Sequence, residues 1–312
     1  MANWIGGYEQ LTEMKTAGSG SARWCIAKRY GQRFFVKEFL SPVYPGEEKK
    51  SQLAKKQRKR CVAFEEKKQR LYSAMSCVLG DSLVPVVDFF RCEGRYYAVS
   101  EEVQPPYVTG EELEKLSHKK VQKLLFLLAQ CLQRLHHQGI VHADLKPEHI
   151  MLLNRGDEYA FKLIDLDSGF LQDDVQEGMG EMEGDPVYLA PETFLRMTGE
   201  PVSLTGMVDT FAMGILIHQL WTGRLPKIDK DKHTYLYEAA LAEGEIQISQ
   251  SLPLGYRLLV ERMLRRDPAE RPVDEELVRL LAPIQEEELP KEHLKKTQPL
   301  NGLRRRFKSR YF

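Results

Sequence analysis

The chain has 312 residues, 42% of them hydrophobic, and its 45 basic and 45 acidic side chains give a formal net charge of zero. This suits one large or two small domains with a proper hydrophobic core. The five cysteines are scattered with no C-x-x-C pair, which argues against a zinc site and favours free thiols in a reducing compartment. The longest apolar run, 124–129, is too short to span a bilayer, and the first residues, M-A-N-W-I-G-G, lack a signal segment, so we expect a soluble cytoplasmic protein.

The first part of the chain is expected to be β-rich. Residues 8–40 alternate in the manner of strands, with a break at Gly18, Ser19 and Gly20. Glycines at such a break let backbone N–H groups approach a phosphate, although a flexible hairpin turn is the simpler interpretation of the break taken alone. Lys37 lies 19 residues after Gly18, on the strand predicted over 33–40.

A polar, basic segment follows these strands. Residues 41–60 are expected to form a link, and the stretch 49–70 holds ten Lys or Arg against two Glu. A solvated helical face explains this charge, and an acidic partner is the alternative. Apolar residues at Phe64, Leu71 and Met75 have helical spacing, so we expect a main helix here.

The middle of the chain combines two strands with a long helix. The strands are expected near 83–92 and 95–103, and the two prolines at 105–106 mark a boundary. A broad apolar face predicts a helix over 117–138 that ends at Gly139. The C-terminal part is expected to be helical as far as a flexible basic tail, which carries eight Lys or Arg after residue 290.

The stretch 140–153 reads I-V-H-A-D-L-K-P-E-H-I-M-L-L and carries Asp144 and Lys146 ahead of a proline. A strand-like run then leads into Asp165-Leu166-Asp167, and residues 184–192 read G-D-P-V-Y-L-A-P-E. Taken in this order, the motifs resemble those of the eukaryotic-type (Hanks-type) serine/threonine protein kinase family, which has H-R-D-x-K-x-x-N, D-F-G and G-T-x-x-Y-x-A-P-E at these places. The departures resemble a divergent, bacterial-like member.

The resemblance implies a bilobal α+β fold. It has a small β-rich N-lobe with one main helix and a larger α-helical C-lobe. We assign residues 1–103 to the N-lobe, with 41–60 as a basic insert before the main helix. Residues 104–289 are assigned to the C-lobe and 290–312 to the basic tail.

The resemblance also implies roles for individual residues. Asp144 would accept the proton of a substrate hydroxyl, with Lys146 beside it as a second catalytic residue. The expected ATP-binding residues are those of the glycine loop, the strand lysine and two backbone contacts to adenine, namely Gly18, Ser19, Gly20, Lys37, Glu101 and Val103.

The metal site is expected to be unusual. Alternation places Phe161 and Leu163 on one face ahead of Asp165, so a choice of Asp167 as the main metal ligand would bury Asp165 at a cost of several kcal/mol. We therefore assign Asp165 to Mg²⁺. His149 stands where the family has a metal-binding Asn, and an imidazole suits Mn²⁺ better than Mg²⁺. A one-metal mechanism, a Mn²⁺ preference and a degenerate site are the alternatives, and Asp167 is a candidate to replace the missing oxygen ligand.

Two regulatory features of the family are altered. In the family's register, Lys67 fills the slot of the helix Glu that pairs with the strand lysine, although Glu66 serves if the helix is rotated. The segment 165–192 holds nine Asp or Glu, no Lys or Arg and only one Ser or Thr, Ser168. Asp185 replaces the usual phosphorylated Thr, and Ala143 replaces the Arg that would bind its phosphate. We therefore predict a kinase without a phosphorylation switch, in which Asp185 pairs with Lys146.

Two structural contacts follow from the same resemblance. Asp209, in a helix that resembles the family's D-x-x-x-x-G helix, is expected to brace the backbone of the catalytic loop. Arg271 is expected to form a salt bridge with Glu192, the acidic residue of A-P-E.

These features favour an ATP-dependent serine/threonine protein kinase that uses Mg²⁺, or Mn²⁺. A pseudokinase that binds nucleotide or acts as a scaffold is the alternative, and a small-molecule kinase is a third. The acidic segment suggests substrates with basic residues near the acceptor. The basic stretch 49–70 and the tail are candidate contacts for an acidic partner.

Overall fold

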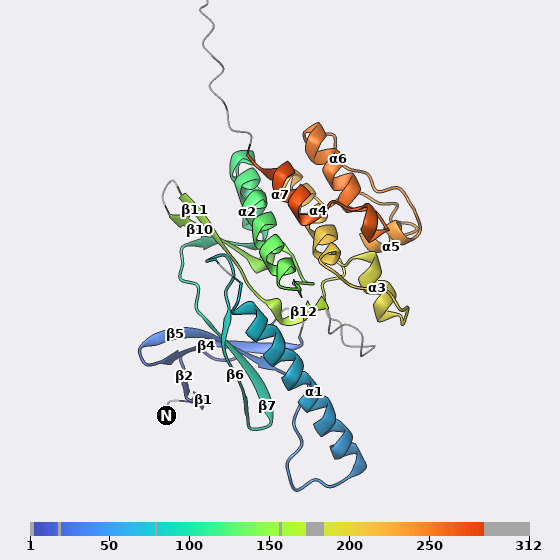
Figure 1. The fold of residues 1–312 in the computed structure, drawn as a ribbon. Helices are drawn as coiled ribbons and strands as arrows, with labels where there is room; N and C mark the ends of the chain where they lie inside the picture. The colour runs from blue at the N-terminus through green and yellow to red at the C-terminus, as the bar shows by residue number, and fades with distance from the viewer. Residues whose placement is uncertain (1–2, 18–19, 79, 156–157, 173–183, 284–312) are drawn as a thin grey trace, which may run out of the picture. The chain divides into compact units, whose positions relative to one another are not determined.

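The computed structural model describes residues 3–17, 20–78, 80–155, 158–172 and 184–283. These form two lobes (Figure 1), of which the first is built on an antiparallel sheet with the strand order β1-β2-β4-β5-β7-β6 and with β3 beside β4. Its strands are β1 (Trp4–Ile5), β2 (Tyr8–Gln10), β3 (Lys15–Thr16), β4 (Ala22–Arg29), β5 (Gln32–Phe39), β6 (Val86–Cys92) and β7 (Arg95–Glu101).

Alternation along β5 explains where Lys37 points. Phe34 and Val36 are buried in an outer apolar cluster, together with Tyr97 and Val99 of β7. Lys37 has the opposite parity and therefore lies on the other face of the sheet, where it is paired in register with Ala98. That face packs against the second lobe and the main helix, so the lysine is directed into the interior of the protein.

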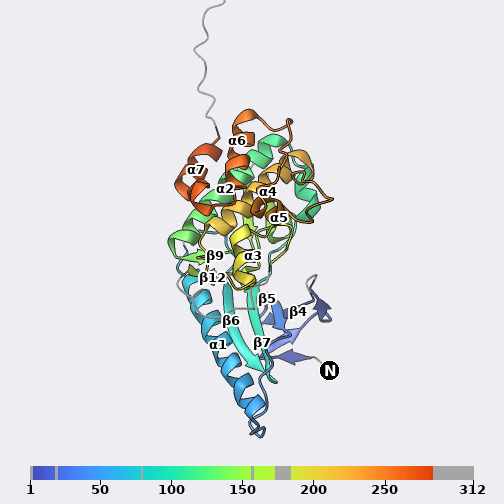
Figure 2. The same ribbon diagram turned by 90° about the vertical axis from the view of Figure 1, so that its right-hand side faces the viewer.

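The main helix of this lobe is α1 (Gln52–Met75), which begins at Ser51, whose hydroxyl accepts a hydrogen bond from the amide of Ala54. The second half of the segment 41–60 is therefore helical, rather than a link throughout as the sequence suggested. The N-terminal half of α1 projects past the ends of β6 and β7 (Figures 1 and 2). Its buried stripe contains one charged residue, Lys68.

The second lobe is mostly helical, with two short sheets at its junction with the first. Its helices are α2 (His118–His137), α3 (Pro191–Met197), α4 (Met207–Thr222), α5 (Leu236–Leu241), α6 (Leu254–Met263) and α7 (Asp274–Leu281). One sheet has the order β11-β10-β8, from β8 (Tyr107–Val108), β10 (Ile150–Arg155) and β11 (Glu158–Leu163). The other pairs β9 (Ile140–Val141) with β12 (Phe170–Leu171).

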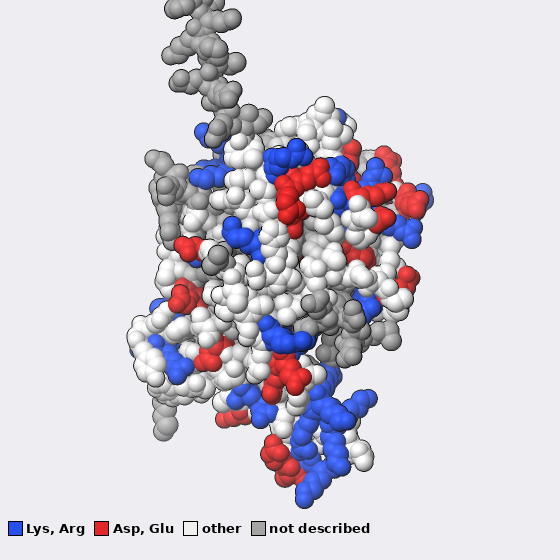
Figure 3. Space-filling model, in the orientation of Figure 1, with Lys and Arg blue, Asp and Glu red and all other residues white. Residues whose placement is uncertain are grey.

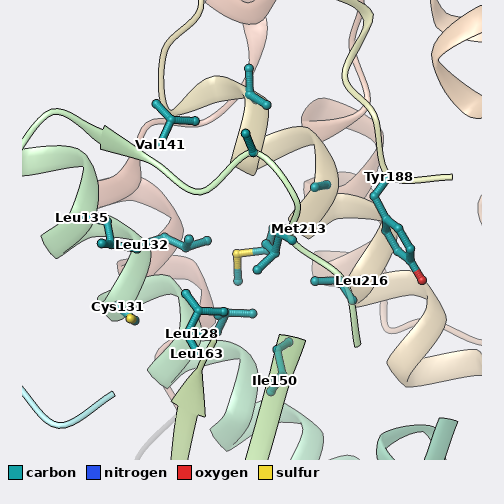
Figure 4. Close-up of a cluster of buried hydrophobic side chains, with 14 of the residues drawn as sticks. Leu128, Cys131, Leu132, Leu135, Val141, Ile150, Leu163, Tyr188, Met213 and Leu216 are labelled. Carbon is teal, nitrogen blue, oxygen red and sulfur yellow. The ribbon is translucent and has the colours of Figure 1, made fainter. Parts of the chain in front are cut away.

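The core of this lobe lies between α2 and α4. Figure 4 shows Leu128 and Leu132 of α2 facing Met213 and Leu216 of α4, and all four side chains are buried. Helix α4 is apolar around almost its whole circumference, as expected for a central helix. Gly139, with φ of +69°, ends the α2 segment as predicted.

The α+β bilobal fold is thus the predicted one. All five cysteines are free thiols, also as predicted. No helix among the described residues is both long and apolar enough to cross a bilayer. The tail predicted at 290–312 lies outside the described residues.

Candidate active site

The loop that carries Asp144 is held from behind by Asp209 of α4. The two carboxylate oxygens of this fully buried residue accept hydrogen bonds from the amides of His142 (2.7 Å) and Ala143 (2.8 Å). Ala143 has a φ of +63°, and the paired amide bonds stabilise this left-handed backbone. The predicted brace by Asp209 is confirmed.

Asp209 is itself held by a histidine that sequence reasoning missed. Nε2 of His136 lies 3.0 Å from Asp209 Oδ2, and Nδ1 lies 2.9 Å from both oxygens of Asp274, the first residue of α7. Burial alone would lower the pKa of His136, but the hydrogen bonds to the two carboxylates outweigh it and raise the pKa to about 9. An Asp–His–Asp chain therefore connects α7 to the catalytic loop.

The structure brings Asp144 and Lys146 together as predicted. The amine of Lys146 lies 3.1 Å from Asp144 Oδ2 and 3.7 Å from Asp185 Oδ2, and the amide of Asp185 donates to Asp144 Oδ1 at 3.0 Å. The predicted contact between Asp185 and Lys146 is therefore confirmed. Asp144 is only 13% exposed, and the contacts on both of its carboxylate oxygens fix its orientation.

Lys37 and Asp165 also meet, although they are 128 positions apart in sequence. The amine of Lys37 lies 2.8 and 3.0 Å from the two oxygens of Asp165 and 2.5 Å from Oδ2 of Asp167. Burial opposes ionisation of Asp165, but the nearby Lys37 and His149 more than compensate and lower the pKa of its carboxyl. Asp165 has a φ of +61°, which is a strained backbone for a residue with a side chain.

His149 lies between the two carboxylates Asp144 and Asp165. Its Nδ1 is 2.7 Å from the carbonyl oxygen of Asp144, and its Nε2 is 3.6 Å from Asp165 Oδ2. A carbonyl oxygen can only accept a hydrogen bond, so Nδ1 carries a proton. In the neutral ring the lone pair therefore lies on Nε2, on the side of Asp165.

Asp167 is enclosed by protein contacts. Beside Lys37 on Oδ2, it accepts a hydrogen bond from the hydroxyl of Tyr72 on Oδ1 (3.1 Å), and its carbonyl oxygen accepts one from the amine of Lys68 (2.5 Å). Across the described chain, no group of three or more His, Cys, Asp or Glu side chains is arranged as a ready metal cage. The assignment of Asp167 as a metal ligand stays a prediction.

The register expected for α1 was wrong by one residue. Lys67 and Glu66 are both exposed, and the residue that points inward is Lys68. Glu65 instead accepts a hydrogen bond from the hydroxyl of Tyr96 at 2.5 Å. Among the described residues, the ion-pair partners of the strand lysine are therefore aspartates of the 165–167 segment and not a helix glutamate.

The structure describes some, but not all, of the predicted nucleotide-binding residues. Gly18 and Ser19 lie outside the described residues, while Gly20 follows them with a φ of +71°. Glu101 and Val103 line a cavity of about 370 Å³ beside the crossing between the lobes. Its lining, which otherwise includes residues of the 83–85 and 104–106 segments, does not include Lys37, Asp144 or Asp165.

Glu192 and Arg271 form the predicted salt bridge. The guanidinium donates to the carboxylate at 2.6 and 2.9 Å, and both side chains are buried. Arg271 also donates to backbone carbonyl oxygens of Met207, Arg265 and Arg266, so its remaining N–H groups are satisfied. The contact ties the start of α3 to the start of α4 and to the loop before α7.

Comparisons with known proteins agree with this geometry. The sequence profile of the protein kinase domain matches residues 20–280. The serine/threonine-protein kinase Pkn1 of Myxococcus xanthus is 32% identical over 160 residues, which are 50% of this chain and 22% of that protein. The serine/threonine-protein kinase PkaA of Streptomyces coelicolor is 34% identical over 162 residues, 51% of this chain and 28% of that protein. The chain thus spans well under half the length of these relatives.

Among solved structures, the kinase PK-1 of the Cydia pomonella granulovirus is similar, with a TM-score of 0.61 at 18% identity over 88% of this chain and 95% of that one. At this identity the likeness shows the fold alone. The profile match covers most of the chain, and the motifs meet at one site in the expected order. The chain therefore belongs to the protein kinase family, among its Hanks-type serine/threonine members.

Proposed function

We propose that this chain transfers the γ-phosphate of ATP to a serine or threonine hydroxyl of a protein. The observation that carries the proposal is the fixed Asp144 carboxylate, oriented by Lys146 and by the amide of Asp185, on a loop anchored to Asp209. Phosphoryl transfer depends on positioning and charge neutralisation more than on covalent chemistry, and this arrangement provides the positioning.

The chain's own residues divide the work. Asp144 orients the acceptor hydroxyl and takes its proton. Lys146, 3.1 Å from Asp144, neutralises charge on the phosphoryl group in transfer. Lys37 binds the α- and β-phosphates, and the backbone at Gly20, Glu101 and Val103 holds the rest of the nucleotide.

The residues present fit a divalent cation. Asp165 supplies a carboxylate and His149 supplies Nε2, whose lone pair is set by the hydrogen bond from Nδ1 to Asp144. A cation bound there would neutralise phosphate charge. Because one of the two donors is an imidazole nitrogen, we propose that Mn²⁺ supports activity better than Mg²⁺. Asp167 remains a third candidate ligand.

The alternative is a pseudokinase that binds nucleotide without transfer. It is favoured by the engagement of Lys37 with two carboxylates and by the loss of the family Asn at His149. A radiolabelled-phosphate assay on a generic basic protein substrate, with Mg²⁺ and with Mn²⁺, separates the two. Transfer that is abolished in Asp144→Asn supports the kinase, whereas nucleotide binding without transfer in either metal supports the pseudokinase. Labelling of metabolites alone would indicate a small-molecule kinase.

We further propose that the basic face of α1 contacts an acidic partner. Lys and Arg side chains gather over the N-terminal half of this helix in Figure 3. The exposed ones on the helix include Lys55, Lys56 and Lys59, and the exposed Lys49 and Lys50 lie just ahead of it. Binding to an immobilised polyglutamate peptide that weakens steeply between low and high salt would support this, and binding unchanged by Lys55→Glu/Lys59→Glu would oppose it.

A further inference from the structure

Helix α1 contributes an amine to the active site where the family resemblance implies a carboxylate. Lys68 is 5% exposed, and its amine donates to the carbonyl oxygen of Asp167 at 2.5 Å. Leaving an ammonium in such a place without compensation is strongly unfavourable. The position therefore calls for a physical explanation.

The protein compensates this charge with aromatic faces. The rings of Phe39, Phe64 and Tyr72 lie 5.2, 5.7 and 5.9 Å from the amine of Lys68. Burial lowers the pKa of Lys68, an effect opposed first by the charge of Asp167. The lysine is thus held between an aromatic wall and the segment that carries the two aspartates.

Asp167 has the complementary surroundings. Its carboxylate contacts the amine of Lys37 at 2.5 Å and the hydroxyl of Tyr72 at 3.1 Å, and its side chain is 18% exposed. Two amines and two carboxylates, those of Lys37, Lys68, Asp165 and Asp167, therefore form one neutral set. A carboxylate at position 68 would place three anions around Lys37, and loss of the carboxylate at 167 would leave two cations to share Asp165.

We infer that Asp167 is the carboxylate that positions Lys37 in this protein, and that Lys68 ties α1 to the 165–168 turn in place of a direct link between a helix carboxylate and Lys37. Both are positioning residues that act through the strand lysine. The inference rests on the proposed phosphoryl transfer for its effect on rate. It also predicts that the effect of a charge change at position 68 depends on the charge present at position 167.

The test is a double-substitution cycle of Lys68→Glu and Asp167→Gly. The readouts are kcat and KM for ATP, the Kd of ATP by direct titration in Mn²⁺, and the thermal unfolding midpoint. Each single change should lower kcat/KM by about 100-fold, because each leaves like charges facing one another. The double change returns a carboxylate to the helix and removes the one at 167, so it should recover to within about 10-fold of the wild type.

The matched control is Lys67→Glu, which makes the same charge change one position away on the exposed side of α1. It should leave kcat, KM and the unfolding midpoint within about twofold or about 1 °C of the wild type. If Lys68→Glu fails to fold, Lys68→Gln takes its place in the cycle, and if Asp167→Gly fails to fold, Asp167→Asn takes its place. Both replacements remove the charge at nearly constant side-chain volume. These variants should raise the KM for ATP clearly and lower the thermal unfolding midpoint only slightly.

Two results would overturn the inference. One is a double variant whose kcat/KM and Kd equal the product of the single effects, which would mean that the two positions are independent. The other is a Lys67→Glu variant as impaired as Lys68→Glu. If the wild type transfers no phosphate, the proposed kinase activity fails by itself. The coupling between positions 68 and 167 is then measured in the Kd of ATP. If no nucleotide binds, the coupling is measured in the thermal unfolding midpoint.

Discussion

The Nδ1 atom of His149 lies 2.7 Å from the carbonyl oxygen of Asp144, so the residue that departs from the family's metal-binding Asn also holds the catalytic loop in place. This single hydrogen bond fixes which ring nitrogen can act as a ligand. If His149 binds the metal as proposed, the metal preference depends on the same residue that holds the loop.

Replacement of His149 by Asn should change the metal preference. An amide oxygen suits Mg²⁺ better than an imidazole does, so the ratio of Mn²⁺-supported to Mg²⁺-supported kcat should fall by about 10-fold or more. Steady-state assays at saturating levels of each metal measure this ratio. His137→Asn, at an exposed histidine on α2, is the control. An unchanged ratio in His149→Asn would exclude His149 as a ligand.

Activity should not depend on phosphorylation between Asp165 and Glu192. Asp185 already provides a carboxylate 3.7 Å from Lys146, while its amide holds Asp144. Phosphatase treatment of the purified protein should therefore leave kcat unchanged. Asp185→Ala should lower kcat by about 10-fold, because Lys146 loses a charge partner. An Asp185→Thr protein that becomes active only when that Thr is phosphorylated would contradict the prediction.

The Glu192–Arg271 pair should be a large contributor to stability. Both side chains are buried, so Glu192→Gln or Arg271→Met leaves one charge without its partner and should cost about 3–5 kcal/mol of unfolding free energy. Urea denaturation measures this loss. The partly exposed pair Arg262–Glu276 is the comparison, and Glu276→Gln should cost less than about 1 kcal/mol. Equal losses at the two pairs would show that burial is not the deciding factor.

Stability should fall as the pH rises through the pKa of His136. The pKa is raised from 6.5 to about 9 in the folded state, so the folded protein binds this proton more tightly than the unfolded chain. The resulting stabilisation is complete below pH 6.5 and is lost between there and about pH 9. It amounts to on the order of 3 kcal/mol. Unfolding free energies measured at several pH values should show this decline in the wild type and much less of it in His136→Gln. A decline of the same size in the variant would assign it to other groups.

Motif order made much of the site predictable. Asp144, Lys146, Asp165 and Lys37 were each identified from a short local pattern, and the fold brings them together as those patterns imply. Asp209 and Arg271 were found in the same way. Such patterns can be recognised from the sequence because each depends on the backbone conformation of a few consecutive residues, even where the contacting partner is distant in sequence.

The missed residues depend on packing instead. The family register assigned Lys67 to the inward position, but the phase of α1 is set by its buried residues Cys61, Leu71 and Met75, which place Lys68 inside. A shift of one residue turns a helix by about 100°. His136 was missed because its partners lie 73 and 138 positions away, and a histidine in an apolar helix is typical of a core.

The Asp–His–Asp chain has a consequence for the boundaries of the folded unit. The motif residues between Lys37 and Glu192 are complete long before α7 begins, yet α7 supplies Asp274, the outer end of the chain that holds the catalytic loop. A fragment cut ahead of Asp274 would retain every motif residue named above, from Lys37 to Arg271. It would lose one of the two carboxylates that raise the pKa of His136, and so weaken the support behind Asp209. The structural support of the catalytic loop therefore extends past Glu192, as far as Asp274 of α7.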